Sequence, residues 1–235
     1  MNDKYQRFKD APWFNFGQET YTSYKSPLIG GIGGIGSWLA LFLSRAGFKT
    51  VVCDNDRVET INLAGQLYSN VHVGQLKVDA IFDVCNKLGT VIPDLNDVLI
   101  QNLENILPYS FSCFDSMAAR KVMFDRWVNN LEMFKTLGLD VAPIFIDGRL
   151  TANQFQIFCV TEDKIQEYRK NLFDDKDIPD TPCSFKQTSH ISAMIASFMT
   201  SYFTNHIVNG YSKEIVYTVP FKTDFFSPLN MFEYV

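Results

Sequence analysis

A glycine-rich turn near the start of the chain has the residue pattern best suited to chemistry. Residues 31–36 form a G-x-G-x-x-G pattern between an apolar segment and a helical one, with glycines at Gly31, Gly33, Gly34 and Gly36. Glycine permits a sharp turn and lets phosphate oxygens approach backbone N–H groups, and the following helix adds unpaired donors and a partial positive charge. Asp54 ends the next β-branched segment, where a carboxylate can accept hydrogen bonds from ribose hydroxyls. The pattern therefore predicts a nucleotide site.

The periodicity around the turn predicts a β-α-β unit. An apolar strand at 26–29 precedes the glycines, and a helix at 37–46 and a strand at 49–53 follow them. The alternation continues with a helix at 73–88, strands at 98–101 and 110–114, a helix at 117–130 and a strand at 143–147. This order indicates an α/β, Rossmann-like three-layer fold with a mostly parallel sheet.

The last third of the chain changes pattern. Residues 153–161 alternate as a strand without a glycine turn into a helix, and 174–181 form a polar loop. A helix near 188–205 and a β-rich segment at 214–222 follow. We therefore expect the sheet to become mixed toward the C-terminus. Because no repeat or linker interrupts the pattern, we expect residues 1–235 to form one nucleotide-binding domain.

Composition and charge exclude several classes of protein. The chain is 46% hydrophobic, which excludes general disorder, and its net charge of −5 argues against a nucleic-acid partner. The five cysteines contain no C-x-x-C pair, which argues against a zinc site, and their odd number argues against a disulfide framework. The N-terminus lacks the apolar run of a signal peptide. The uncharged stretch 191–208 contains Ser, Thr, Asn and His, so it is interpreted as a core helix and not as a membrane span. We expect a cytoplasmic protein.

A longer motif follows the second strand of the β-α-β unit. Residues 54–66 resemble the D-x-D-x-V-x-x-x-N-L-x-R-Q signature of the ThiF/MoeB/HesA family, the bacterial and phage relatives of ubiquitin-activating enzymes. Residues 73–77 resemble the family's V-G-x-x-K, and Asp115 with Arg120 resembles its D-x-x-x-x-R element. Residues 5–7 and 17–19 resemble its N-terminal lead-in. The resemblance runs from about residue 4 to residue 205.

The resemblance implies an ATP- and Mg²⁺-dependent adenylyltransferase. Its substrate would be a carboxylate, such as the C-terminal glycine of a ubiquitin-like or sulfur-carrier protein, which becomes an acyl-adenylate as pyrophosphate leaves. Lys77 would neutralise the phosphates, and Asp115 would hold the magnesium ion. The nucleotide would also contact Asp54, Asp56, Asn62 and Gln66. Without the resemblance, Lys77 is interpreted as a solvated surface charge and Asp115 as a helix N-cap, a role that is compatible with holding the metal.

One position departs from the family motif. Gly65 stands where the family has Arg, so a cation that faces the phosphates is missing. Arg57 lies eight residues earlier in the chain, so its position in the motif is different and it is not taken as a replacement. A second interpretation is therefore a nucleotide-binding interaction protein with weak or lost turnover. A third, based on the glycine pattern alone, is an NAD-dependent oxidoreductase.

Three further residues are candidates for roles beside the nucleotide. Cys183, after the polar loop, is the candidate nucleophile, although no obligatory thioester is predicted. Arg149 follows a strand end, where it would meet an incoming carboxylate or form a surface ion pair with a nearby Asp. The aromatic segment 5–16 and the resemblance together predict a homodimer in which Arg7 of one subunit reaches the ATP of the other. The other cysteines and the three histidines are expected to be core or capping residues.

Overall fold

The computed structural model describes residues 3–20, 24–136, 142–151, 153–174, 188–211 and 216–235. Within these ranges, one sheet has the strand order β3-β2-β1-β4-β5-β6-β7-β8. The strands are β1 (Leu28–Gly30), β2 (Val51–Cys53), β3 (Asp94–Asn96), β4 (Tyr109–Ser112), β5 (Ile144–Leu150), β6 (Gln154–Val160), β7 (Lys222–Phe226) and β8 (Met231–Tyr234). Strands β1 to β5 pair in parallel, and β6, β7 and β8 pair antiparallel. The predicted mixed α/β sheet is confirmed.

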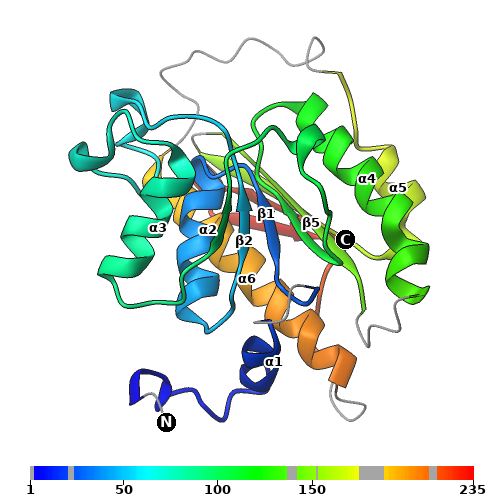
Figure 1. Ribbon diagram of the computed structural model, residues 1–235. Coiled ribbons are helices and arrows are strands. Elements are labelled where there is room, and N and C mark those ends of the chain that lie inside the picture. The colour runs from blue at the N-terminus through cyan, green and yellow to red at the C-terminus, as the bar shows by residue number, and fades with distance from the viewer. Residues whose placement is uncertain (1–2, 21–23, 137–141, 152, 175–187, 212–215) are drawn as a thin grey trace.

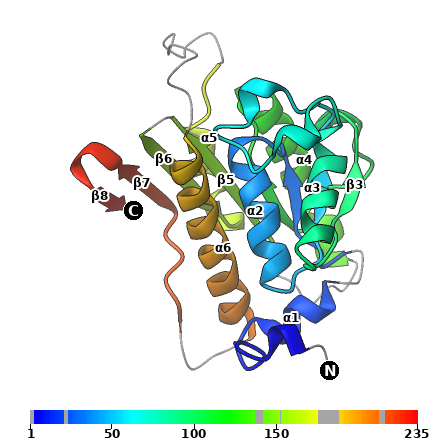
Figure 2. The ribbon, with the colours of Figure 1, turned by 90° about the vertical axis from the view of Figure 1, so that its left-hand side faces the viewer.

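Helices cover both faces of the sheet and give the predicted three layers (Figures 1 and 2). One face is covered by α2 (Gly34–Arg45), α3 (Lys77–Lys87) and α6 (Ser189–Tyr211). The other is covered by α4 (Met117–Thr136) and the short α5 (Ile165–Arg169). The parallel strands therefore have the double cover that buried parallel sheets require.

Aromatic residues fill the core on both faces of the sheet. On one face, Phe203 of α6 lies with its ring centroid 5.4 Å from that of Tyr109 and 5.3 Å from that of Phe111. On the other, Phe124 of α4 lies 4.6 Å from Tyr168 of α5. The uncharged helix is thus a core helix, as predicted, because it packs against α2 and the sheet. Over the described residues, no helix is long and apolar enough to cross a membrane.

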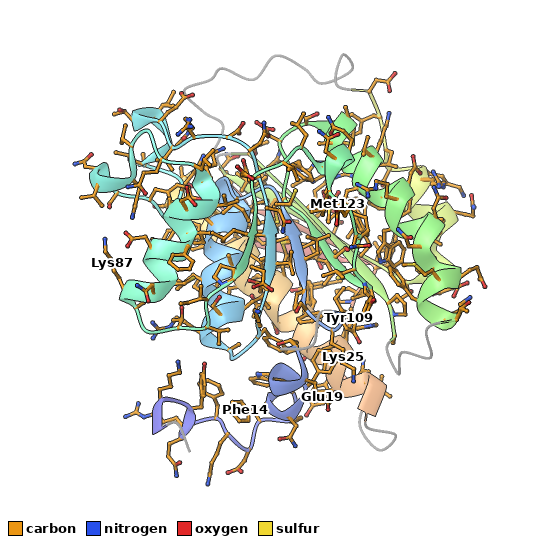
Figure 3. All side chains as sticks on the ribbon, in the orientation of Figure 1. Phe14, Glu19, Lys25, Lys87, Tyr109 and Met123 are labelled. Atoms are coloured by element: carbon orange, nitrogen blue, oxygen red, sulfur yellow. The ribbon has the colours of Figure 1, made fainter. Side chains whose placement is uncertain are left out.

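The N-terminal segment is anchored at the amino ends of the strands (Figure 3). In α1 (Phe14–Glu19), the Phe16 ring packs 5.4 Å from Tyr109, the first residue of β4. The Lys4 ammonium donates to the carbonyl of Gly89, just beyond the end of α3, at 2.9 Å. The segment therefore lies at the carboxyl ends of α2 and α3, away from the glycine turn that begins α2.

Two boundaries near the third strand differ from the prediction. The predicted strand at 98–101 is wrong, because β3 is Asp94–Asn96 and Ile100–Asn102 form a 3₁₀ turn. Apolar periodicity does not mark β3, because its residues are polar or exposed and it pairs on one side only, at the sheet edge. The helix predicted from residue 73 begins at Lys77, since Gly74 has a positive φ of 87° and its N–H donates to the Val58 carbonyl.

The predicted β-rich segment at 214–222 is also misplaced over its described part, which begins at residue 216. Residues 216–221 have no regular secondary structure, and β7 begins at Lys222. The side chain of Asn209 on α6 donates to the Tyr217 carbonyl at 2.8 Å and accepts from the Tyr217 N–H at 2.7 Å. These helix contacts occupy the backbone groups that a strand would have paired. Strand β8 follows a turn at Asn230, which is left-handed with φ 49°.

Candidate nucleotide site

The glycine turn between β1 and α2 has the geometry that its sequence predicts. Gly31 has a φ of 84°, and its N–H donates to the Cys53 carbonyl at 2.9 Å. A Cβ at Gly36 would lie only 1.9 Å from the Gly31 carbonyl oxygen, so this close packing excludes any side chain there. A Cβ at Gly33 would meet only the Gln66 amide nitrogen, at 3.8 Å. The turn therefore leaves room for a ligand over Gly33.

Asp54 directly follows β2 and is hydrogen-bonded to the backbone of this turn. One carboxylate oxygen accepts the Ile32 N–H at 2.6 Å, and the other accepts the Asp56 N–H at 2.8 Å. The residue is 8% exposed, and this burial raises the pKa of Asp54 above its usual value although the Lys77 charge opposes the shift. Two lone-pair sites remain for a ligand. The predicted contact with a ribose stays a prediction.

Lys77 begins α3 and is not the solvated surface charge of the alternative interpretation. Its side chain is 9% exposed, and its ammonium lies 2.7 Å from a carboxylate oxygen of Asp56. The Lys77 N–H also donates to the Asp56 carbonyl at 2.9 Å. Asp56 itself is 65% exposed, so the cation is paired with an anion that water still reaches. The expectation of a solvent-exposed ammonium is wrong because the carboxylate offsets the cost of burial.

The segment between β2 and α3 carries the amides predicted to contact a nucleotide. Asn62 accepts the Glu59 N–H at 2.9 Å and caps a 3₁₀ turn. Gln66 is buried, and its side-chain oxygen has no hydrogen-bond partner among the described residues. Gly65, which replaces the family arginine, accepts a hydrogen bond from the Trp38 indole at 3.3 Å. Sequence reasoning missed Tyr68, whose hydroxyl donates to the Ile32 carbonyl at 2.6 Å, because only the fold brings these residues together.

Asp115 follows the end of β4 and is exposed. Within the described ranges its carboxylate has no hydrogen-bond or ion-pair partner, which leaves it available to a cation. It is not the cap of α4, because the Ser116 hydroxyl accepts the Ala119 N–H at 3.3 Å. The alternative interpretation of Asp115 as the N-cap is therefore wrong.

The predicted residues line one cleft at the carboxyl ends of the parallel strands, with a volume of about 1530 Å³. Its walls include Gly31, Gly33, Gly34, Asp54, Asp56, Asn62, Gln66, Lys77 and Asp115. Gly36 is not among them and serves packing instead. No group of three or more His, Cys, Asp or Glu side chains suited to a metal occurs among the described residues. A divalent cation at Asp115 would thus need further ligands from a bound substrate of the protein.

A family model described as the ThiF family matches residues 11–228. The chain belongs to the ThiF family. Residues in this range include every predicted site residue except Arg7.

Relatives of this ThiF chain agree with the assignment. Over 91 residues, or 38% of the chain, it is 35% identical to the Zea mays protein "Adenylyltransferase and sulfurtransferase MOCS3-2". Over 100 residues, or 42% of the chain, it is 32% identical to "Adenylyltransferase and sulfurtransferase MOCS3" of Oryza sativa subsp. japonica. The matched stretch spans about a fifth of the length of these proteins, 19% and 22% respectively.

Solved structures confirm the ThiF-like fold. PaaA matches with a TM-score of 0.68 at 18% identity, over 100% of this chain and 83% of PaaA. E. coli MccB, solved with ATP, matches with a TM-score of 0.66 at 14% identity, over 100% of this chain and 71% of MccB. At these identities the likeness concerns the fold.

Arg120 and Arg149 of this ThiF chain share the buried carboxylate of Asp147. Arg120 of α4 donates to Asp147 and to the Phe114 carbonyl, and the Arg149 Nε donates to Asp147 at 2.7 Å. The Tyr168 hydroxyl donates to the same carboxylate at 3.0 Å. Burial would raise the pKa of Asp147, but the two guanidinium groups hold it below its usual value. Arg149 therefore forms an ion pair with a nearby Asp, as one of its two predicted roles states, but the prediction that this pair lies at the surface is wrong because the Asp147 carboxylate is fully buried.

Arg7 and Cys183 do not join the cleft residues. Arg7 is exposed, and it belongs to the N-terminal segment, which lies at the far end of α2 from the glycine turn (Figure 1). Cys183 lies outside the described residues. The other four cysteines are free and buried, as predicted for core residues, and burial together with the Asp54 charge raises the pKa of Cys53 to about 12. His72 caps a 3₁₀ turn through the Ser69 N–H at 3.1 Å, which confirms its predicted capping role.

Proposed function

We propose that this ThiF chain binds ATP and Mg²⁺ in the cleft and adenylates a carboxylate, with the C-terminal glycine of a ubiquitin-like or sulfur-carrier protein as the substrate. The observation that carries the proposal is the placement of Lys77, Asp115 and the glycine turn around one cleft. A cation and an unpaired carboxylate on opposite sides of a phosphate-binding turn suit a magnesium-bound triphosphate. An NAD site requires neither this cation nor this carboxylate.

The residues present fit this nucleotide. The Gln66 side-chain oxygen is buried without a partner in the described structure. The residue lines the cleft, and its amide nitrogen faces the open space over Gly33. A hydroxyl or amino donor on a ligand would satisfy the side-chain oxygen. Asp115 would supply one oxygen ligand to Mg²⁺, and phosphate oxygens and water would supply the others, as is usual for this ion.

The chemistry is an in-line displacement at phosphorus. A carboxylate oxygen of the substrate attacks the α-phosphorus of ATP, the bond from that phosphorus to its bridging oxygen breaks, and pyrophosphate leaves with the electron pair. Lys77 would leave Asp56 for the phosphates and offset the negative charge there, while Asp115 holds the metal. The chain's contribution is position and charge.

The names of the relatives support adenylyl transfer. The maize and rice proteins are called adenylyltransferases and sulfurtransferases, and MccB has been solved with ATP and with MccA. By analogy we extend adenylyl transfer to this chain, and the protein carboxylate substrate is proposed from the motif resemblance. We also propose a cytoplasmic homodimer, on the strength of the five cysteines without a disulfide pattern and the aromatic N-terminal segment.

The test is ATP–pyrophosphate exchange in the presence of Mg²⁺ and candidate ubiquitin-like or sulfur-carrier proteins. Exchange that needs both Mg²⁺ and a free C-terminal carboxylate supports the proposal. Thermal-shift measurements should also show a higher melting temperature with ATP and Mg²⁺ than with NAD. ATP binding without exchange for any carrier would favour the second function, a nucleotide-binding interaction protein, which the absent cation at Gly65 motivates.

A further inference from the structure

A row of polar side chains crosses the second half of the sheet on one face. The strand register pairs Arg149 of β5 with Gln156 of β6, Gln156 with Asp224 of β7, and Asp224 with Glu233 of β8. Side chains of directly paired residues on neighbouring strands point to the same face. All four residues line the cleft. The row begins beside β4, after which Asp115 lies, and ends at β8 on the edge of the sheet.

The inner end of the row is positive. Arg120 and Arg149 share one carboxylate, that of Asp147, so this buried group has a net charge of about +1. Arg149 donates its Nε–H to Asp147 and an Nη1–H to the Asn171 carbonyl at 3.0 Å, whereas its Nη2 has no hydrogen-bond partner among the described residues. A buried unpaired N–H is costly, and an anionic oxygen would satisfy it.

The outer end of the row is negative. The Gln156 amide donates to one carboxylate oxygen of Asp224 at 2.6 Å, and the Lys222 ammonium lies 2.6 Å from the other. Asp224 is therefore neutralised. Glu233 is exposed, and its side-chain carboxylate has no hydrogen-bond or ion-pair partner in the described part of the chain, so its charge is uncompensated.

We infer that this row is a track for the extended C-terminal tail of the substrate, with its carboxylate at Arg149 and a lysine or arginine side chain at Glu233. The inference rests on the proposed function and adds a specificity to it. The track runs from the strands that hold the nucleotide to the sheet edge, so a tail on it would bring its carboxylate next to Asp115. The negative carboxylate of the tail would lie at the positive inner end of the track and its basic side chain at the negative outer end, so the charges fix the direction in which the tail lies.

The spacing of the strands sets where the basic residue belongs. Three inter-strand distances of ~4.8 Å separate Arg149 from Glu233, about 14 Å in total, which an extended peptide covers in about four residues. The tail should therefore carry its lysine or arginine about four positions before the terminal carboxylate.

The experiment selects peptides on the whole chain without ATP. A synthetic pool of octapeptides with a free C-terminal glycine and seven random positions is passed over the immobilised protein, and retained peptides are sequenced by mass spectrometry. We expect lysine and arginine to be enriched about threefold to fivefold at the fourth or fifth position from the C-terminus, the effect of one exposed ion pair. The same pool with amidated C-termini should lose this enrichment, which tests Arg149 without disturbing its buried ion pair.

A charge reversal tests the outer end. Glu233→Lys should reverse the preference to aspartate and glutamate at the same position, whereas Glu132→Lys, the same change on the exposed face of α4, should leave it unchanged. Three results would overturn the track. The first is no enrichment of lysine or arginine by the unaltered protein, and the second is enrichment of apolar or acidic residues in their place. The third is the same peptide profile for Glu233→Lys as for the unaltered protein. Because retention needs no turnover, absent ATP–pyrophosphate exchange would count against the proposed function alone.

Discussion

Lys77 is held in place before any nucleotide arrives, because its ammonium rests on Asp56 beside the cleft. We predict that Lys77→Met lowers ATP–pyrophosphate exchange by at least about 100-fold, the loss expected when a group that stabilises developing charge is removed. The unfolding free energy should change by no more than about 1 kcal/mol, since Met keeps the packing and the exposed Asp56 becomes solvated. Exchange and urea unfolding are the measurements.

Lys87→Met is the matched control for this variant. Lys87 ends the same helix, is exposed and pairs with Asp83 four residues earlier. Its substitution should leave both exchange and stability within error. A large loss of stability in Lys77→Met with exchange unchanged per folded molecule would show that Lys77 is structural.

Asp115 lies outside the core, so its role in metal binding can be separated from folding. We predict that Asp115→Asn abolishes Mg²⁺-dependent exchange while the melting temperature is unchanged, because the amide is a poorer ligand for a hard cation and nothing packs on the exposed side chain. Asp125→Asn, on an exposed ion pair of α4 with Arg169, should retain full exchange. Undiminished exchange in Asp115→Asn would remove this residue from the site.

At the scale of elements, the sequence predicted well wherever local chemistry decides the structure. The glycines fix β1, the turn and α2, because Gly31 and Gly36 permit no side chain. The prediction was wrong where residues distant in sequence determine the structure. The side chains of Asn205 and Asn209 on α6 donate hydrogen bonds to backbone carbonyls within 216–221, so this segment is not a strand. The edge strand β3 has no apolar periodicity by which it could be predicted. The ion pair of Lys77 with Asp56 and the shared carboxylate of Asp147 likewise join residues from separate elements, and no spacing in the chain reveals them.

Asp147 joins α4, β5 and α5 through Arg120, Arg149 and Tyr168, so its charge should stabilise the fold. The pKa of Asp147 in the folded chain is below the ordinary value of 3.8, so the unfolded chain takes up the proton first. The stabilisation is therefore complete above about pH 4 and is lost as the pH falls further. We predict that Asp147→Asn lowers the unfolding free energy by about 3–5 kcal/mol at pH 7 and flattens this acid dependence.

Urea unfolding between pH 7 and pH 2 measures both effects. Asp97→Asn, which replaces an exposed carboxylate, should keep the acid dependence of the unaltered protein. An equal acid slope in Asp147→Asn and the unaltered protein would contradict the prediction.

At the scale of the whole molecule, the position of the N-terminal segment restricts what Arg7 can do. Gly17 of α1 packs against Gly47, just past the carboxyl end of α2, whereas the cleft lies at the amino end of that helix. The 12 residues of α2 span about 18 Å, so the segment and the cleft of one chain are at opposite ends of the helix. If Arg7 contacts phosphate, it must be the phosphate of another copy.

We predict a homodimer in which Arg7 acts across the interface and partly compensates for the cation missing at Gly65, since a guanidinium binds phosphate oxygens bidentately. Arg7→Ala and Asp115→Ala should each be inactive alone. Mixed in equal amounts and allowed to exchange subunits, half of the dimers would be mixed and one of their two sites would be intact, so about a quarter of the exchange activity should return. Mass spectrometry with isotope-labelled subunits verifies that exchange of subunits has occurred. A monomer in light scattering at assay concentration, or no recovery after verified subunit exchange, would contradict a role for Arg7 in the partner's site.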